Sequence, residues 1–215
     1  MARPVLYVLA GVNGAGKSSI GGHLLTQAGL AWFNPDTFAR ELIAASGCAQ
    51  DDANAAAWHE GFRRLERAIK EARSYAFETT LGGNSIPARL KAATRTHDVV
   101  VWFCGLASPE QHVARVKARV AMGGHDIPET KIRERCTTAL ANLVALMPHL
   151  AHLRVYDNSA DVAAGEAIPD PVLVLEMADG RLLWPTEPSD LRNTPDWAKP
   201  LLEAAIATGN SSGID

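Results

Sequence analysis

The chain has 215 residues, of which 47% are hydrophobic and 21% are charged, a composition typical of a folded globular protein. Its formal net charge of −3 gives no overall attraction to nucleic acid or anionic lipid, so we expect neither nucleic acid nor membrane as a partner. No apolar run approaches the roughly 18 residues of a membrane helix, and three cysteines without metal-like spacing fit a reduced, cytoplasmic setting.

Apolar segments that predict strands alternate with segments that predict helices. Strands are expected at 4–10, 31–33, 75–80, 98–106 and 153–159, with a hairpin over 171–185 around Asp179-Gly180. Helices are expected at 17–27, 36–45, 51–73, 86–95, 108–122, 129–147 and 195–207. Within 51–73, Trp58, Phe62, Leu65 and Ile69 recur at helical spacing and predict one apolar face. This alternation predicts an α/β fold, a parallel sheet with helices on both faces.

The first strand runs directly into a Gly-rich loop, Gly11-Val12-Asn13-Gly14-Ala15-Gly16-Lys17-Ser18, which satisfies the pattern G-x-x-x-x-G-K-[ST]. Glycines let backbone N–H groups turn inward around a polyphosphate, and the following helix directs its positive end at the same anion. Lys17 would reach the β and γ phosphates, and the Ser18 hydroxyl would ligate Mg²⁺. The predicted nucleotide-binding residues are Gly11, Asn13, Gly14, Ala15, Gly16, Lys17, Ser18 and Ser19. A Gly-rich turn without a ligand is the alternative.

Two acidic residues follow predicted strands, at the sheet edge where ligands bind in parallel α/β folds. Asp36 comes after the strand at 31–33, and Glu78 lies at the end of the strand at 75–80. Asp36 could accept the proton of a substrate hydroxyl, and Glu78 could hold the substrate or the water shell of Mg²⁺. The structural alternatives are an N-cap for Asp36 and a solvated strand end for Glu78.

The two helices at 108–122 and 129–147 are joined through a Gly-Gly hinge that is flanked by Arg115, Arg119, Arg133 and Arg135. Arginines on two helices around a hinge are typical of a kinase lid, which closes over the transferring phosphoryl group and excludes water. Arg119 and Arg133, each one turn from the hinge, are predicted to contact phosphate. Arg115 and Arg135 are expected to pair or to face solvent. A solvated, charged helix face is the alternative.

Taken together, these segments resemble the zeta-toxin family of P-loop kinases, in particular its small, stand-alone bacterial branch. The resemblance rests on "GVNGAGKSS", "FNPD", "FETTLGG" and "RVAMGGHDIPETKIRER" and spans Val5 to Asn158. It implies a P-loop NTPase three-layer sandwich with a nucleotide-kinase-like helical lid. It also implies ATP or GTP with Mg²⁺ as donor, and phosphorylation of a sugar hydroxyl of UDP-N-acetylglucosamine; more distant relatives use other small nucleotides, NAD among them.

The resemblance also implies roles for single residues. Lys17 and Ser18 fall on the Walker A lysine and the Mg²⁺ ligand, Asp36 on the catalytic base, and Glu78 on the substrate-side acid. The lid arginines of the family fall on Arg119 and Arg133. Family members that are toxins have an antitoxin protein as partner, although this chain is shorter than those toxins. The region between Asp36 and Glu78, where sugar-nucleotide contacts would lie, carries no transferable motif.

We therefore expect a P-loop kinase core over 1–160, with a lid at about 119–135, and a C-terminal elaboration over 161–215 packed on the same domain. The expected activity is phosphorylation of a hydroxyl on a small nucleotide-linked sugar. Three alternatives stay open from the sequence: a kinase of another small metabolite such as NAD, a nucleotide-gated binding or switch protein, and a polynucleotide-end kinase.

Overall fold

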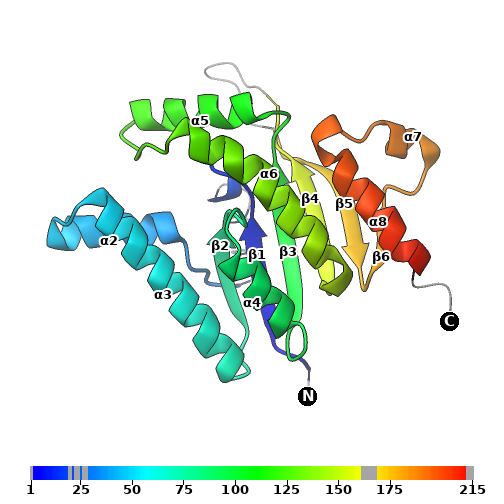
Figure 1. The fold of residues 1–215 in the computed structure, drawn as a ribbon, viewed down its shortest axis with the longest axis horizontal. Coiled ribbons are helices and arrows are strands. Elements are labelled where there is room, and N and C mark those ends of the chain that lie inside the picture. The colour runs from blue at the N-terminus through cyan, green and yellow to red at the C-terminus, as the bar shows by residue number, and fades with distance from the viewer. Residues whose placement is uncertain (1, 19–20, 22–24, 26–28, 161–168, 212–215) are drawn as a thin grey trace.

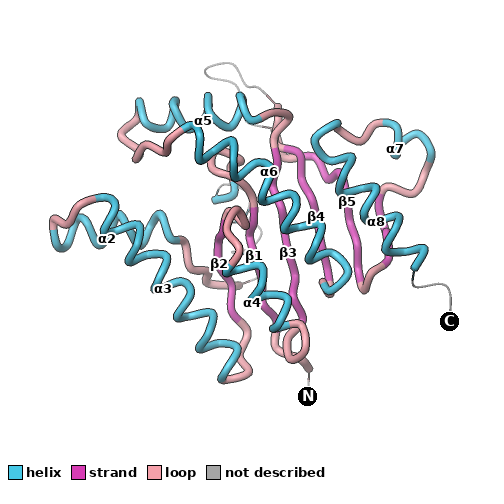
Figure 2. Tube along the Cα trace, in the orientation of Figure 1, coloured by secondary structure: helices cyan, strands magenta, loops and turns pink. Residues whose placement is uncertain are grey.

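The computed structural model describes residues 2–18, 21, 25, 29–160 and 169–211, and it contains one six-stranded sheet. The strands follow the order β2-β1-β3-β4-β5-β6, with bounds β1 Val5–Ala10, β2 Tyr75–Thr79, β3 Asp98–Gly105, β4 His152–Asp157, β5 Val172–Ala178 and β6 Arg181–Trp184. The first four strands in this order are parallel, β5 pairs antiparallel with β4, and β6 pairs antiparallel with β5. Figure 2 shows these strands side by side. The predicted α/β class is confirmed.

The helices form three groups around the sheet. Their bounds are α2 Pro35–Ser46, α3 Gln50–Lys70, α4 Ser85–Ala93, α5 Pro109–Ala121, α6 Glu129–Leu146, α7 Pro188–Arg192 and α8 Lys199–Ser211. In Figure 1, α4, α6 and α8 cover one face, α2 and α3 extend beyond the β2 edge, and α5 lies at the carboxyl ends of the parallel strands. The helix expected over 17–27 falls mostly outside the described residues.

The strand expected at 31–33 is shorter than predicted, because only Phe33 pairs with the sheet. The Phe33 N–H donates to the Ala76 carbonyl at 2.9 Å, and the Glu78 N–H donates to the Phe33 carbonyl at 2.9 Å. Asn34 then caps α2, and Pro35 has no N–H for further pairing. This single bridge sets Asn34 and the start of α2 beside the end of β2.

Alternation along β1 divides the core between the two faces of the sheet. Leu6, Val8 and Ala10 belong to the large core cluster under the helices, whereas Leu9 packs with Ala15 and Cys104. The C-terminal part shares the large cluster: α8 contributes Leu201, Leu202 and Ala205, beside Leu143 and Leu146 of α6. Because this core is continuous, we propose that the segments before and after residue 160 unfold as one unit.

Replacing Leu201 with alanine should therefore destabilise the whole protein by about 2–5 kcal/mol, since Leu201 is fully buried and a cavity would remain. Ile206→Ala on the same helix is the matched control. Its side chain is 42% exposed, so the free energy of unfolding should change by less than about 0.5 kcal/mol. Urea unfolding followed by tryptophan fluorescence and far-UV circular dichroism measures both. Two separate transitions would contradict a single unit.

Candidate active site

The Gly-rich loop takes a conformation that requires glycine at both of its ends. Gly11 has φ of 143°, and a Cβ there would collide with the Cys104 carbonyl oxygen of β3. Gly16 has φ of 81°, and its Cβ would collide with the Asn158 side chain. Both values lie in the region that side chains rarely adopt. The loop is thus seated against the ends of two neighbouring parallel strands, with Lys17 buried.

Three elements distant in sequence hold this loop by hydrogen bonds. Asn158, after β4, donates through Nδ2 to the Ala15 carbonyl at 2.9 Å. Nδ1 of His112, on α5, lies 2.9 Å from the Asn13 carbonyl, which can only accept, so Nδ1 carries the proton. Arg135, on α6, donates to Asn13 Oδ1 at 2.8 Å. Asn13 is therefore bound on its backbone by one helix and on its side chain by the next.

Beside the loop, four polar side chains form one connected cluster. Ser18 Oγ donates to Glu78 Oε2 at 3.0 Å, and Asn34 Nδ2 donates to the same oxygen at 3.0 Å. The Lys17 ammonium lies 3.5 Å from Glu78 Oε1 and donates to the Val12 carbonyl at 3.4 Å. Glu78 is only 8% exposed, so it is not a solvated strand end. Its carboxylate is held by a hydroxyl, an amide and an ammonium.

Asp36 and Arg119 reach toward each other from opposite sides of the site. The N-cap of α2 is Asn34, whose side chain accepts from the Thr37 N–H, so the Asp36 carboxylate is not the cap. Asp36 Oδ2 lies 3.7 Å from an Arg119 guanidinium nitrogen. Arg119 also donates to the His125 carbonyl at 3.3 Å, which fixes it to the loop between α5 and α6.

The two arginines of α6 face different surroundings from those expected. Arg133 is bound by Glu129 at 2.8 Å and by Glu110 at 2.6 Å on the surface of α5 and α6. The Arg133 guanidinium lowers the pKa of both carboxyls by hydrogen bonding. Arg135, expected to pair or to face solvent, donates to Asn13 of the Gly-rich loop. In this conformation Arg135, and not Arg133, is the α6 arginine at the loop.

The segment "LGG" after β2 fixes the position of α6. Asn142 donates to the carbonyls of Leu81 at 2.7 Å and Gly83 at 3.1 Å, and Thr138 donates to the Gly82 carbonyl at 2.9 Å. A Cβ at Gly82 would meet the Arg135 side chain. These contacts between the loop after β2 and α6 therefore determine the position of Arg135.

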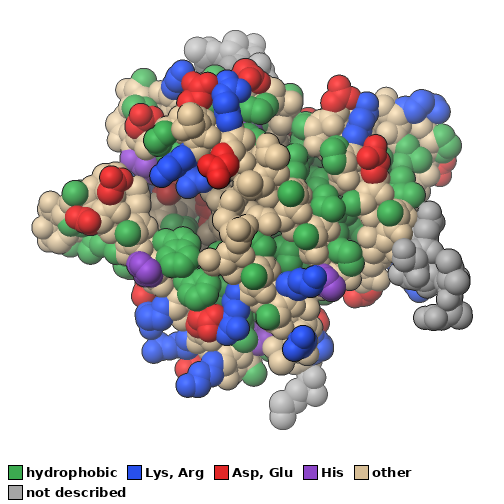
Figure 3. Space-filling model, in the orientation of Figure 1, with side chains coloured by type: hydrophobic (Ala, Val, Ile, Leu, Met, Phe, Trp, Pro, Cys, Tyr) green, Lys and Arg blue, Asp and Glu red, His purple; other side chains and the backbone are tan. Residues whose placement is uncertain are grey.

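A cleft of about 550 Å³ opens between α2–α3 and α6, and the Gly-rich loop lies at its base. Figure 3 shows it as a hollow between these helices. Its lining includes Lys17, Asp36, Asn54, Trp58, Lys131 and Arg135. A cavity of about 610 Å³ lies elsewhere, around Arg3, His97 and Asp179, and it contains none of the residues predicted for the site.

Of the predicted site residues, the structure brings together Gly11, Asn13, Gly14, Ala15, Gly16, Lys17, Ser18, Asp36, Glu78 and Arg119. Ser19 lies outside the described residues. Sequence reasoning missed Asn34, His112, Arg135 and Asn158. Asn34 and Asn158 could have been found as polar residues directly after strands. No sequence pattern in the helix that carries His112 predicts that this residue faces the loop.

A Gly-rich loop after the first strand of a parallel sheet, with a buried lysine and a hydroxyl at the start of the next helix, defines a P-loop nucleotide-binding fold. The family model described as AAA domain (AAA_33) matches residues 6–141. The chain belongs to this AAA domain family. Among the described helices, none combines the length and apolar character needed to cross a membrane.

Known proteins share this fold at low sequence identity. The chain is similar to the AvrRxo1-ORF1:-ORF2 complex with ATP, with a TM-score of 0.65 and 16% identity over 90% of this chain and 64% of that one. For the PezAT chromosomal toxin–antitoxin system of Streptococcus pneumoniae, the TM-score is 0.56 and the identity 13%, over 98% and 87% of the two chains. At these identities, the likenesses show a shared fold.

One relative is similar in sequence. An uncharacterized protein of Haemophilus influenzae is 41% identical over 69 residues, which are 32% of this chain and 49% of that protein. The matched part thus spans about half the length of this relative. The first of the structural relatives is likewise covered over less than two thirds of its chain.

His112 predicts a pH-dependent stability. Burial lowers the pKa of His112 to about 4, against about 6.5 in an unfolded chain. Between these values the unfolded chain binds a proton that the folded protein refuses, so stability is lost as pH falls from 6.5 to 4. Between about pH 7.5 and pH 5, this loss should reach about 2 kcal/mol in urea unfolding. His112→Gln should lose this part of the pH dependence; an unchanged profile would exclude His112 as its source.

Proposed function

We propose that the protein is a Mg²⁺-dependent phosphotransferase that moves the γ-phosphoryl group of ATP or GTP to a hydroxyl of a small nucleotide-linked sugar. The observation that carries this proposal is the meeting of a P-loop with Asp36 and Arg135 in one cleft, with Arg119 paired to Asp36. The Gly-rich loop binds the donor phosphates, and the cleft beside it holds the acceptor. Similarity to a complex with ATP supports the choice of donor.

In the proposed reaction, the acceptor oxygen forms a bond to the γ-phosphorus while the bond from that phosphorus to the β–γ bridging oxygen breaks. The proton of the acceptor hydroxyl passes to the Asp36 carboxylate, and the nucleoside diphosphate leaves with the electron pair of the broken bond. Asp36 is suited to this role because it lines the cleft and its side chain is 47% exposed. Lys17 neutralises charge on the phosphates.

The residues beside the loop fit Mg²⁺. The Ser18 hydroxyl and the Glu78 carboxylate are hard oxygen donors 3.0 Å apart, and Mg²⁺ is commonly held by one or two such groups together with water and phosphate oxygens. Asn34 orients both oxygens through its Nδ2. When bound, the ion would neutralise charge on the transferring phosphoryl group.

Two arginines supply positive charge to the transition state in this proposal. Arg119 stands beside Asp36, and Arg135 stands beside Asn13 of the loop. Phosphoryl transfer spreads negative charge over the equatorial oxygens, which guanidinium groups stabilise. The helices that carry both arginines are joined by the Gly123-Gly124 hinge, so lid closure would move them as a pair.

UDP-N-acetylglucosamine is the acceptor that we propose to test first, and NAD is the second. Similarity to a toxin–antitoxin system also supports a test for an antitoxin protein as partner. A nucleotide-gated switch protein remains the second function; it would bind nucleotide and modify no acceptor.

Asp36→Asn should keep nucleotide affinity but lower phosphoryl transfer by about 10²–10⁴-fold, because the hydroxyl proton would lose its acceptor. The protein, Mg²⁺ and ATP or GTP would be incubated with UDP-N-acetylglucosamine, other UDP-sugars and NAD, and mass spectrometry would detect the gain of one phosphate. Near-normal turnover in this variant would reject Asp36 as the base.

Lys17→Ala is the companion to that experiment, since it should weaken nucleotide binding itself. Unchanged nucleotide affinity in a titration would count against the Gly-rich loop as the phosphate-binding site. If nucleotide binds and no compound in the panel gains phosphate, the switch function replaces the kinase.

The two arginines of α6 can be separated by single substitutions. Arg135→Ala should lower kcat by about 10³-fold, the effect of losing an arginine from a phosphoryl-transfer site. Arg133→Ala, which breaks only the surface pairs with Glu110 and Glu129, should cost less than about tenfold. The opposite order would restore the sequence prediction for Arg133 and would require α6 to turn when the lid closes.

A further inference from the structure

The inner face of α3 presents an aromatic surface to the cleft. The rings of Trp58 and Phe62 are stacked, with centroids 5.4 Å apart and planes at 13°. Both side chains line the cleft, and Trp58 is 47% exposed. Phe62 stacks on the indole, and the His59 ring lies edge-on to it with centroids 5.0 Å apart. A large, half-exposed aromatic side chain in a pocket is suited to hold a flat ring by stacking.

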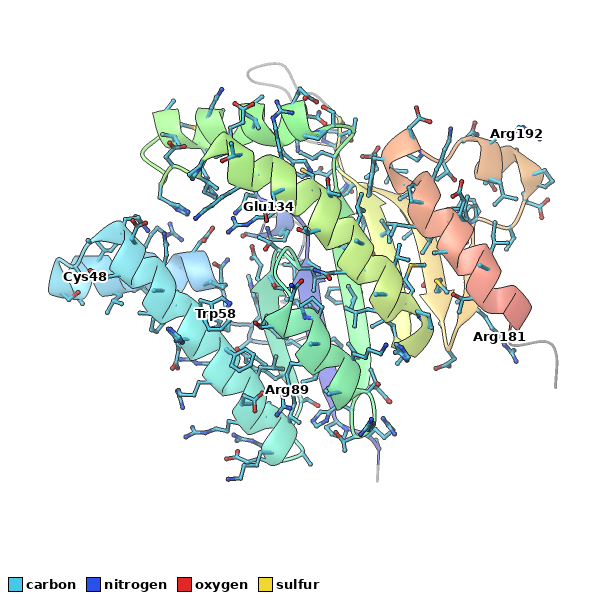
Figure 4. All side chains as sticks on the ribbon, viewed as in Figure 1. Cys48, Trp58, Arg89, Glu134, Arg181 and Arg192 are labelled. Carbon is cyan, nitrogen blue, oxygen red and sulfur yellow. The ribbon has the colours of Figure 1, made fainter. Side chains whose placement is uncertain are left out.

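The exposure of Trp58 differs from the sequence prediction of one apolar face along this helix, and the packing of α3 explains it. Trp58, Phe62 and Leu65 share one helical stripe, but only Leu65 is fully buried in the core. Gly61 lets α3 approach Phe33 closely, since a Cβ at 61 would lie 2.8 Å from the Phe33 ring. The second half of α3 therefore packs on the sheet, while its first half projects past the sheet edge. Figure 4 shows Trp58 on α3 and Glu134 of α6 on opposite sides of the cleft.

A polar group lies one helical turn before the indole. Asn54 lines the cleft, and its Oδ1 accepts from Gln50 Nε2 at 3.0 Å. This contact orients the amide and directs Asn54 to offer N–H groups to a ligand. Residues four apart lie on the same helix face. A ring stacked on Trp58 would thus have its edge near a hydrogen-bond donor.

The charges that line the cleft favour phosphate groups at the Gly-rich loop rather than along α3. The cleft lining contains the carboxylates of Asp36, Asp51, Glu78, Asp126 and Glu134 but only the cations Lys17, Lys131 and Arg135. The positive groups Lys17 and Arg135 lie at the phosphate loop. The part of the cleft along α3 is therefore suited to an uncharged ring with polar edges.

We propose that the base of a nucleotide acceptor stacks on Trp58, with Asn54 hydrogen-bonded to its edge, and that this contact selects nucleotides over free sugar phosphates. This inference rests on the proposed function, because it concerns the acceptor of the same reaction. In this arrangement the sugar attached to the nucleotide would lie toward Asp36, which is in the first turn of α2 and lines the same cleft.

The test is isothermal titration of the full chain loaded with Mg²⁺ and a non-hydrolysable ATP analogue. The titrants are UDP-N-acetylglucosamine, NAD and N-acetylglucosamine 1-phosphate, the last of which has a sugar phosphate but no base. At least one base-containing compound should bind more tightly than the base-free one. Trp58→Ala should raise its Kd about tenfold, within the range for base–aromatic stacking, and leave the base-free compound within twofold. Trp58→Phe should retain most of the affinity.

Trp184→Ala is the matched control, because Trp184 is an exposed tryptophan on β6, away from the cleft lining. It should leave every Kd within twofold. The proposal is overturned if no base-containing compound binds, if Trp58→Ala changes its Kd less than twofold, or if the base-free compound loses affinity equally. The last result would mean that Trp58 contacts the sugar.

The two proposals fail in different ways. If a compound is phosphorylated with dependence on Asp36 while Trp58→Ala leaves its Kd and KM unchanged, the kinase stands and the stacking contact is wrong. If nucleotide acceptors bind with dependence on Trp58 but none is phosphorylated, the stacking contact stands and the kinase is wrong.

Discussion

The position of the Gly-rich loop is the constraint on which the rest of the site depends. Its backbone is held from α5 by His112 at Asn13, and from the end of β4 by Asn158 at Ala15. Burial lowers the pKa of His112 to about 4, so this histidine stays neutral near pH 7 and adds no charge beside the phosphates. The loop is preorganised, which means that little ordering remains to be done when an anion binds.

The cluster beside the loop depends on one short contact with the sheet. Phe33 pairs with β2 through a single bridge, and this bridge sets Asn34 next to Glu78. Asn34 then serves two structures, since its Oδ1 caps α2 and its Nδ2 binds Ser18 and Glu78. The same turn therefore fixes the Ser18 and Glu78 oxygens, which we propose bind Mg²⁺, and the start of the helix that carries Asp36. The aromatic surface of α3 faces the cleft because the second half of this helix packs on Phe33.

Much of this could be predicted from the sequence, because strand and helix patterns and the loop motif are local. The alternation of elements, the hairpin at Asp179-Gly180 and the position of Glu78 at the sheet edge beside the loop are of this kind. Contacts that depend on the rotation of a helix about its own axis could not be predicted from the sequence. Arg133 and Arg135 are two residues apart, and only the packing of α6 on the loop after β2 decides which one faces Asn13. Trp58 likewise lies on an apolar stripe whose first turn extends beyond the core.

The double contact at Asn13 also has a thermodynamic meaning. The Arg135 side chain of α6 binds the Asn13 side chain, and the His112 side chain of α5 binds the Asn13 carbonyl. In a P-loop, a residue at this position would touch the donor phosphates. If donor binding favours one position of these helices, then that position of the helices favours donor binding by the same free energy. In the proposed reaction, an acceptor that draws the two helices inward would strengthen donor binding by the same factor by which the donor strengthens acceptor binding. Mutually reinforcing binding of the two proposed substrates can thus arise from a single asparagine.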